Sequence, residues 1–220
     1  MKVCIYIPIK TNNTRLPGKT FKLLAGKQLY SYLFNTIKKL GIPVYISSSD
    51  DSIQKISKEW GFNFLKQPEE LNANTITGNA LLNHYIDLID ADLICFCHIT
   101  SPFMSLETIK KGISELEGNR ELDSILGVSP IYNRCWFNGK PINHDPEKLL
   151  RTQDLTPIYV ETPDIYFVKK ESFKKYKKRV CGNLKTLVVQ PIEATDIDNL
   201  SDFINAESLL NSGIVNFKWD

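Results

Sequence analysis

Short apolar segments alternate with helical patterns along residues 1–128 of the chain. The first segment, residues 3–7, is almost wholly apolar and ends at Pro8, a pattern typical of a strand that is buried on both faces. Strands of this kind lie in parallel sheets, where helical crossovers join neighbouring strands. The alternation therefore predicts an α/β fold, a three-layer Rossmann-like sandwich around a mostly parallel sheet.

Residues 130–160 break this alternation, because Asn, Pro, Gly and aromatic residues are mixed there without a clear period. We expect an inserted arm at approximately residues 130–165 and a single domain over residues 1–220. The remaining elements are expected as helices at about 29–40, 51–60, 75–89, 105–116 and 200–210, and as strands at 43–48, 62–65, 93–98, 124–128, 165–168 and 186–190.

The charges are almost balanced overall but strongly segregated along the chain. The 220 residues carry 27 Lys and Arg against 25 Asp and Glu, a formal net charge of +2. Residues 1–40 hold eight bases and no acid, residues 169–185 hold eight bases and one acid, and residues 186–220 hold one base and six acids. The balance argues against a nucleic-acid partner, whereas the segregation suggests a small polyanionic ligand.

The sequence also lacks the usual signs of a membrane or secreted protein. No apolar run approaches the roughly 20 residues that a membrane span needs. The start of the chain shows no long apolar stretch followed by a small-residue cleavage site. We therefore expect no membrane partner and a cytoplasmic location.

The loop after the first predicted strand, residues 10–19, is the first candidate site. Its three cations are Lys10, Arg15 and Lys19, and Asn13 and Gly18 add a hydrogen-bonding group and room for close backbone approach. The loop matches neither GxGxxG nor GxxxxGK[ST], which excludes a dinucleotide fingerprint and a P-loop. Fixed cations and polar groups of this kind can bind a triphosphate, and a solvated basic loop is the alternative.

Asp196 and Asp198 form the second candidate site. In an extended segment, residues i and i+2 point to the same side, so both carboxylates can face one hard cation. Mg²⁺ is commonly held by one or two carboxylates together with substrate phosphates. The alternative is a solvated acidic turn before the last helix.

A third set of residues could contact a second substrate. His98 ends the fourth predicted strand, Arg151 and Gln153 lie in the irregular region, and Tyr166 follows it. A core histidine, a surface guanidinium and a buried tyrosine are the plain alternatives.

Together these pieces resemble the motifs of the cytidylyltransferases that activate acidic sugars, the acylneuraminate (CMP-sialic acid synthetase) and 3-deoxy-manno-octulosonate enzymes. The run IPIKTNNTRLPGK, residues 7–19, is similar to their N-terminal signature. The resemblance covers roughly residues 3–210. Its further motifs follow in the family's order: Ser47-Ser48-Ser49-Asp50, Pro68-Glu69-Glu70-Leu71, Thr100-Ser101-Pro102, Arg151-x-Gln153-x-Leu155 and Thr195-Asp196-Ile197-Asp198.

The resemblance implies a nucleotidyltransferase fold and a CTP-dependent enzyme of the EC 2.7.7 type. It would transfer CMP from CTP to an acidic, nonulosonic-acid-like sugar, release pyrophosphate, and serve the synthesis of surface polysaccharide. The resemblance further implies a homodimer in which the arm reaches over the partner's site.

The resemblance also assigns roles to residues. Lys10, Arg15 and Lys19 would be the catalytic cations that hold the triphosphate and stabilise the departing pyrophosphate. Asn13, Gly18 and Gln67 would complete the CTP site, Asp196 and Asp198 would bind Mg²⁺, and His98, Arg151, Gln153 and Tyr166 would contact the acceptor.

Some positions depart from the family pattern. Gln67 stands in place of an arginine, Thr20 in place of an asparagine, and residues 162–164 read Thr-Pro-Asp where the acylneuraminate family has Asn-Gly-Ala. The added Asp164 would repel a carboxylated sugar unless it is paired, so a related nonulosonate or another acidic or phosphorylated acceptor stays open. A GT-A-type glycosyltransferase and a catalytically silent nucleotide-binding protein also stay open as functions, and residues 169–185 have no assigned role.

Overall fold

The computed structural model describes residues 1–219 of the chain. Its main strands are β1 (Val3–Pro8), β4 (Val44–Ser48), β5 (Asn63–Lys66), β6 (Leu93–Cys97), β7 (Ser124–Ile131), β10 (Ile158–Lys169) and β11 (Leu184–Val188). Its helices are α1 (Leu29–Lys38), α2 (Asp51–Trp60), α3 (Gly78–Tyr85), α4 (Leu106–Gly118), α5 (Lys170–Tyr176) and α6 (Leu200–Asn211). Two small hairpins, β2–β3 (Leu23–Leu24 and Lys27–Gln28) and β8–β9 (Trp136–Phe137 and Lys140–Pro141), and three 3-10 turns, η1 (Lys19–Phe21), η2 (Glu69–Asn72) and η3 (Thr152–Asp154), complete the fold.

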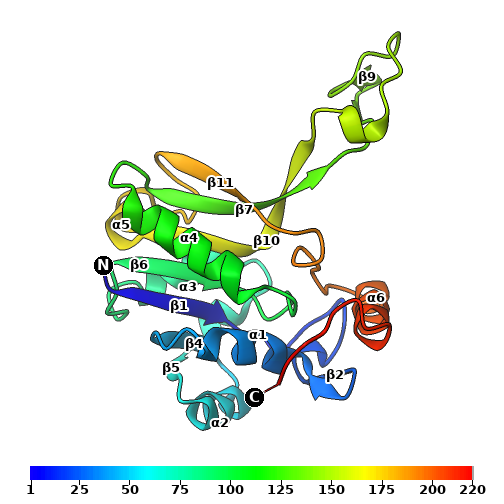
Figure 1. The fold of residues 1–220 in the computed structure, drawn as a ribbon. Coiled ribbons are helices and arrows are strands. Elements are labelled where there is room, and N and C mark those ends of the chain that lie inside the picture. The colour runs from blue at the N-terminus through cyan, green and yellow to red at the C-terminus, as the bar shows by residue number, and fades with distance from the viewer. Residues whose placement is uncertain (220) are drawn as a thin grey trace.

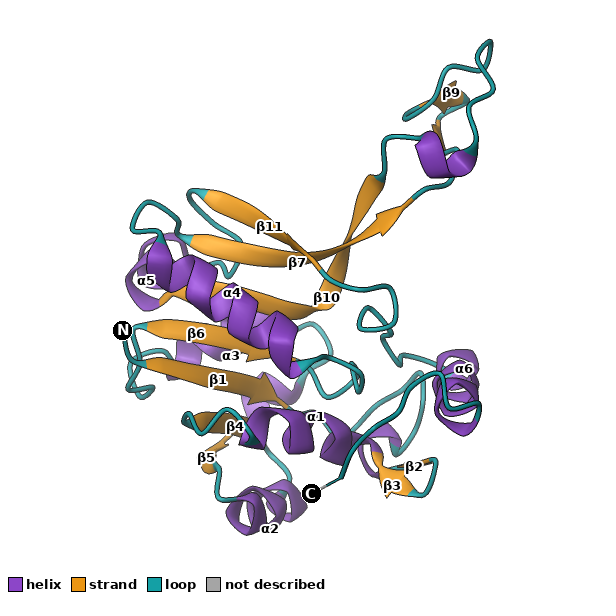
Figure 2. Ribbon diagram, in the orientation of Figure 1, coloured by secondary structure: helices purple, strands orange, loops and turns teal. Residues whose placement is uncertain are grey.

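The seven main strands form one twisted sheet in the order β11-β7-β10-β6-β1-β4-β5 (Figures 1 and 2). All neighbouring strands are parallel except β10, which runs antiparallel to both β6 and β7. The carboxyl ends of β1, β4 and β6 therefore meet at one edge of the sheet. In open α/β sheets this edge is where ligands bind.

Helices cover both faces of the sheet and give the predicted three layers. Ile5 and Ile7 of β1 pack with α1, α2 and α4 on one face, and Cys4 and Tyr6 pack with α3 and α5 on the other. These four side chains are 0% exposed. The prediction of a mostly parallel sheet, buried on both faces, is confirmed.

Several element boundaries differ from the sequence-based expectation. The helix expected at 75–89 is shorter, because the Thr77 hydroxyl caps it by accepting from the Ala80 amide and regular helix ends at Tyr85. Helix α5 was not expected, because its lysine-rich sequence contains a single large apolar residue that is buried, Phe173, and therefore shows no helical period of apolar residues. The last long strand, β10, begins seven residues earlier than expected at Ile158, where it pairs with β7.

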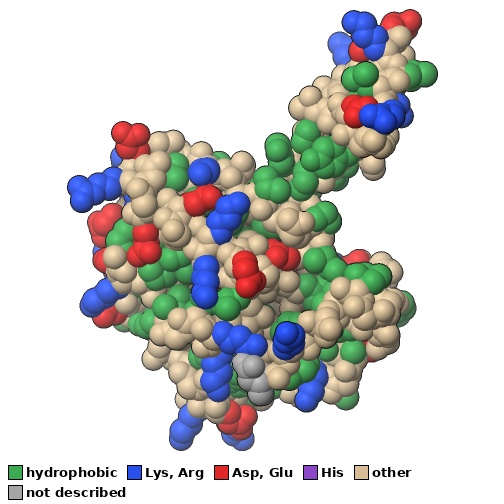
Figure 3. All heavy atoms as spheres, in the orientation of Figure 1, with side chains coloured by type: hydrophobic (Ala, Val, Ile, Leu, Met, Phe, Trp, Pro, Cys, Tyr) green, Lys and Arg blue, Asp and Glu red, His purple; other side chains and the backbone are tan. Residues whose placement is uncertain are grey.

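The irregular region projects from the body as an arm (Figure 1). Its base is a two-stranded ribbon in which Ile158 of β10 faces Ile131 of β7, and it carries the β8–β9 hairpin and η3. Hydrophobic side chains gather where the arm leaves the body (Figure 3), and Tyr132, Tyr159 and Val160 of this base are exposed. Within residues 1–219, no helix has the length and apolar character needed to cross a membrane.

Gly112 of α4 provides a test of the packing between helix and sheet. A Cβ atom at Gly112 would overlap the ring of Phe167 on β10, which is 0% exposed, whereas a Cβ at Gly118 of the same helix would meet nothing within 4 Å. We therefore expect Gly112→Ala to lower the free energy of unfolding by about 1–3 kcal/mol in urea titrations. Gly118→Ala is the matched control and should be neutral or slightly stabilising. Equal effects of the two substitutions would contradict this packing.

Candidate active site

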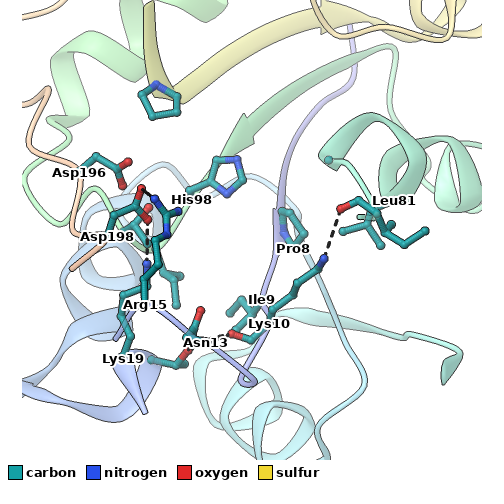
Figure 4. Close-up of a pocket in the computed structure, with 16 residues that line it drawn as sticks. Pro8, Ile9, Lys10, Asn13, Arg15, Lys19, Leu81, His98, Asp196 and Asp198 are labelled. Carbon is teal, nitrogen blue, oxygen red and sulfur yellow. Dashed lines mark hydrogen bonds and ion pairs between the residues drawn. The ribbon is translucent and has the colours of Figure 1, made fainter. Parts of the chain in front are cut away.

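A cavity of about 320 Å³ lies at the carboxyl edge of the sheet. Its wall combines five parts of the chain that are far apart in sequence: the end of β1 and its loop, the segment around the start of α3, the turn after β6, Pro163 of β10, and the segment before α6 (Figure 4). An adjoining cavity of about 290 Å³ shares part of this wall. The residues common to both are Lys10, Asn13, Arg15, Lys19 and Asp198.

The cationic loop meets the acidic segment directly. Arg15 Nη1 lies 2.7 Å from Asp198 Oδ2, and Lys19 Nζ lies 3.1 Å from Asp198 Oδ1 (Figure 4). The Lys19 side chain is nearly buried, and its Nζ also donates to the carbonyl oxygen of Ile197 at 2.7 Å. The opposite charges of the N-terminal loop and the C-terminal segment thus compensate one another at the cavity.

The third cation of the loop has a different environment. Lys10 Nζ donates to the carbonyl oxygens of Ala73 (3.0 Å) and Ile76 (3.2 Å), and it has no carboxylate partner among the described residues. Partial burial lowers the pKa of Lys10. Asn13 Nδ2 donates to the Lys10 carbonyl oxygen at 3.0 Å and so holds the loop closed. Lys10 therefore presents an uncompensated positive charge at the cavity wall.

Two residues expected at the CTP site lie off the cavity wall. Gly18 has a φ of 68° at the start of η1, so the turn itself requires glycine there, and Gly18 does not line either cavity. Gln67 is buried and donates through Nε2 to the Leu71 carbonyl oxygen (2.7 Å) and to Asn72 Oδ1 (2.8 Å). Its amide fixes the η2 turn instead of facing the cavities.

The acidic pair has the expected alternating geometry. Asp196 and Asp198 both line the cavity, whereas Ile197 between them is 0% exposed and packs under α6. The Ile197 amide donates to the Thr100 carbonyl oxygen at 2.9 Å, which ties this segment to the turn after β6. Burial raises the pKa of Asp196.

The donor set fits a hard divalent cation that is shared with a substrate. No group of three or more His, Cys, Asp or Glu side chains suited to a metal occurs in the described part of the chain. Asp196 and Asp198 place two carboxylates on one wall of the cavity. Mg²⁺ typically takes one or two carboxylates and completes its shell with phosphate oxygens and water.

His98 lines the cavity at the end of β6, with its ring 5.0 Å from the ring of Phe96. Burial lowers the pKa of His98 to about 3, and the nearby positive charges of Arg179 and Lys19 contribute in the same direction. His98 is therefore a neutral imidazole at physiological pH. It can donate or accept a hydrogen bond without adding charge to the site.

The remaining predicted acceptor residues are not on the cavity wall. Arg151 and Gln153 lie on the arm, where Arg151 Nε is 2.7 Å from Asp154 Oδ2 and its guanidinium is exposed. The arm points away from the body, so these residues do not reach the cavity of their own chain (Figure 1). Tyr166 is 1% exposed within the layer under α3, and its hydroxyl donates to Glu161 Oε1 at 2.7 Å.

Asp164 is an unusual carboxyl group beside the site. The β10–β7 register shifts between Glu161 and Tyr166, and this irregularity brings Pro163 to the cavity wall and buries Asp164, which is 1% exposed. Among the described residues, neither carboxylate oxygen of Asp164 has a partner with full hydrogen-bond geometry, although the nearby Ser101 hydroxyl lowers the pKa of Asp164. Burial raises the pKa of Asp164 to about 8, and the negative charge of Asp196 contributes. Asp164 is therefore mainly protonated at neutral pH.

The shifted pKa of Asp164 predicts a pH-dependent stability. The ordinary pKa is 3.8, so above pH 4 the unfolded chain releases a proton that the folded chain retains until about pH 8. Folding loses stability across this window as pH rises. We expect Asp164→Asn to raise the free energy of unfolding at pH 8, by up to about 5 kcal/mol for a shift of this size, and to change it little at pH 4, measured in urea without metal. Asp90→Asn on the surface is the control, and a pH-independent effect of Asp164→Asn would contradict the assignment.

Sequence reasoning did not find every part of the wall. Ile76 precedes α3, and Gly78 and Leu81 lie in its first turn. The expected helix at 75–89 placed all three residues within a helix, so they gave no indication of a cavity wall. The capping Thr77 followed by Gly78 was the signal that could have placed the helix start there. Arg179, whose charge acts on His98, lies within a basic run that gives no sign of its inward orientation.

A cationic loop and a carboxylate pair at the carboxyl edge of an open α/β sheet are typical of nucleotide-binding α/β proteins. A family model described as cytidylyltransferase matches residues 4–209, and the chain belongs to the cytidylyltransferase family. Its architecture is similar to that of a solved CMP:2-keto-3-deoxy-manno-octonic acid synthetase complexed with CTP, with a TM-score of 0.73, 14% identity and coverage of 96% of this chain and 99% of the other.

Curated relatives activate carboxylated sugars, according to their names. The chain is 30% identical over 132 residues to 3-deoxy-manno-octulosonate cytidylyltransferase 2 of Hydrogenovibrio crunogenus, covering 57% of this chain and 53% of the relative. It is 22% identical to an N-acylneuraminate cytidylyltransferase of Streptococcus agalactiae, covering 93% and 52%. The chain thus spans about half the length of these two relatives. CMP-N,N'-diacetyllegionaminic acid synthase of Legionella pneumophila is 25% identical and is covered over 97% of its length, with 96% of this chain.

Proposed function

We propose that this protein transfers CMP from CTP to an acidic sugar and releases pyrophosphate. The observation that carries the proposal is the convergence of Lys10, Arg15 and Lys19 with Asp196 and Asp198 on one cavity, in a chain of the cytidylyltransferase family. An acceptor hydroxyl oxygen would attack the α-phosphorus of CTP. A new P–O bond would form as the bond between the α-phosphorus and the bridging oxygen breaks, and the hydroxyl proton would leave to solvent or a base.

The three cations differ in how readily each could bind a phosphate oxygen of a triphosphate. Lys10 carries no carboxylate partner among the described residues and can bind a phosphate oxygen without first breaking an ion pair. Arg15 and Lys19 are paired with Asp198, so an arriving triphosphate would share them with this carboxylate. Charge that develops on the departing pyrophosphate would then lie against fixed cations, which lowers the barrier to phosphoryl transfer.

Cytidylyltransferases generally use a divalent metal, and we propose Mg²⁺ held by Asp196 and Asp198. When bound, the ion would neutralise phosphate charge and polarise the reacting group. Asp198 would also keep Arg15 and Lys19 oriented, because both cations contact its carboxylate. Neutral His98 would donate or accept a hydrogen bond with the acceptor sugar across the same cavity.

The names of the curated relatives support a carboxylated acceptor, such as 3-deoxy-manno-octulosonate, an N-acylneuraminate, pseudaminate or legionaminate. Asp164 does not exclude such an acid, because burial favours its protonated form. A protonated carboxyl group would offer a donor in place of a repelling charge. The product would be a CMP-sugar for surface polysaccharide synthesis in the cytoplasm.

We propose that residues 1–220 form one nucleotidyltransferase domain that acts as a homodimer through its arm. Arg151 and Gln153 lie on this arm and away from their own cavity, and exposed apolar side chains occur along it, among them Trp136 and Phe137. In a twofold dimer the arm of each subunit would deliver Arg151 and Gln153 to the partner's acceptor site.

Asp198→Asn tests the proposed metal and cation assignments. The substitution keeps the shape of the side chain but removes the charge that faces Arg15 and Lys19. We expect kcat/KM for pyrophosphate release to fall at least about 100-fold while the urea midpoint shows a folded protein. Asp90→Asn, an exposed carboxylate away from the cavity, is the control and should leave turnover unchanged. Unaltered activity of Asp198→Asn would remove the assignment, and CTP binding in calorimetry without turnover of the wild-type chain would favour a silent nucleotide-binding protein.

Subunit mixing tests the arm. Arg151→Ala and Asp198→Asn should each be nearly inactive alone, because each removes one half of a shared site. After co-refolding, a mixed dimer would contain one intact site, so we expect about a quarter of wild-type activity from random reassociation. No recovery from a verified mixed dimer would place Arg151 outside the partner's site.

A further inference from the structure

The basic run at residues 169–185 has two kinds of members. Most of its lysines contact the outer surface of the body: Lys169 donates to the carbonyl oxygens of Asn119 and Arg120, Lys170 to that of Ile89, Lys174 pairs with Asp87, and Lys185 pairs with Glu115. Arg179 instead turns inward beside the cavity wall. Its position therefore differs from that of a residue on a solvated basic surface.

Arg179 lies against the faces of two aromatic rings that are nearly perpendicular to each other. Its guanidinium carbon lies 3.9 Å from the ring centroid of Tyr166 on β10 and 4.6 Å from that of Phe96 on β6. Cation–π contacts with two rings restrict the position of a guanidinium and leave an N–H group that faces neither ring available for an acceptor. The two rings lie on the same sheet face as α3.

The backbone on both sides of Arg179 is anchored as well. Helix α5 ends where Lys177 adopts a left-handed conformation with a φ of 56°. The Arg179 amide then donates to Asn79 Oδ1 at 3.2 Å, and the Cys181 amide donates to Ser124 Oγ at 2.9 Å. The side chain is therefore positioned by the sheet, by α3 and by its own loop.

One donor of this guanidinium is unused. Arg179 Nη1 is buried and has no hydrogen-bond partner among residues 1–219. It lies against Gly78, the first residue of α3, where a Cβ atom would overlap it. Gly78 lines the cavity, as does His98, on which the charge of Arg179 acts. A buried guanidinium donor without an acceptor is costly in a finished fold, so its position next to the cavity points to a ligand.

The charges around the cavity indicate what this ligand group is. The positive charges of Arg15 and Lys19 are compensated by Asp198, and Lys10 donates to backbone carbonyl oxygens of the segment before α3. Across the cavity from this loop, the described titratable groups are the neutral His98 and the acids Asp164 and Asp196, so that no cation lines this part of the wall. A sugar carboxylate on this side would need a cation. We propose that Arg179 binds the carboxylate of the acceptor sugar through its unpaired Nη1, and that Gly78 is glycine to give this group room.

This role for Arg179 rests on the proposed function, and its test uses two forms of one acceptor. Pyrophosphate release is measured with CTP, Mg²⁺ and the best acid from a panel of 3-deoxy-manno-octulosonate, N-acetylneuraminate, pseudaminate and N,N'-diacetyllegionaminate, and then with the methyl ester of that acid. The wild type should prefer the acid over the ester about 10- to 100-fold in kcat/KM, as expected for a charge-assisted bond. In Arg179→Gln the preference should fall below about threefold, with the KM for the acid raised and the KM for CTP unchanged.

Gly78→Ala tests the position of the Arg179 guanidinium without removing its charge. The added methyl group would displace the guanidinium edge and also approach Phe96 Cζ to 2.9 Å, so we expect the acid preference to fall as it does in Arg179→Gln. Lys178→Gln is the control, because it removes one positive charge from the same loop at an exposed position. It should keep the wild-type preference, and urea midpoints of all three variants verify folding.

The outcomes separate this inference from the proposed function. Wild-type turnover with an unchanged acid-to-ester preference in folded Arg179→Gln and Gly78→Ala overturns the role of Arg179 and leaves the function intact. If no acid in the panel is turned over, the proposed function fails, and calorimetric titration of the same acids into CTP-loaded protein decides the inference. Binding that is at least about tenfold weaker in Arg179→Gln than in Lys178→Gln would support it, and equal binding would overturn it.

Discussion

The contact of Asp198 with Arg15 and Lys19 is the interaction on which the site depends. It joins a loop at the start of the chain to a segment close to its end, across the carboxyl edge of the sheet. Without this carboxylate, the nearly buried Lys19 ammonium would lose its only ion pair among the described residues, which is unfavourable for a charge removed from water. In the proposed function, a triphosphate would face the cations and a divalent cation would face the carboxylates at this same place.

This pairing explains how a site with three clustered cations can occur in a chain that is nearly neutral overall. The excess bases of residues 1–40 and the excess acids of residues 186–220 are not independent surfaces, because they converge on one cavity. The third charged segment, residues 169–185, has two kinds of contact: several of its lysines pair with the surface of the body, while Arg179 packs against Gly78 behind the cavity wall. The net charge therefore says little about where charged residues gather in the fold, whereas the distribution of charges along the chain indicates which segments meet at the cavity.

Local patterns were enough to predict the layers and the acidic pair. Apolar strands such as β1 follow from consecutive buried residues, and Asp196 and Asp198 face one side because Ile197 is buried between them. The strand irregularity at Pro163, the local use of the Gln67 amide and the position of Arg179 could not be predicted in this way. Each depends on contacts between distant segments: Arg179 meets Phe96 and Gly78, about a hundred residues away. The acceptor side is built from such contacts, which is why it departs most from the sequence-based expectation.

The central claim is that this cavity joins CMP to a carboxylated sugar. ³¹P NMR of the wild-type protein with CTP, Mg²⁺ and the acid panel measures this most directly, because it follows both phosphorus products. We expect a phosphodiester resonance of a CMP-sugar that grows with equimolar pyrophosphate, only when CTP, metal and one acid are all present. Pyrophosphate without a CMP-sugar, or no product with any acid while CTP binds normally, would contradict it.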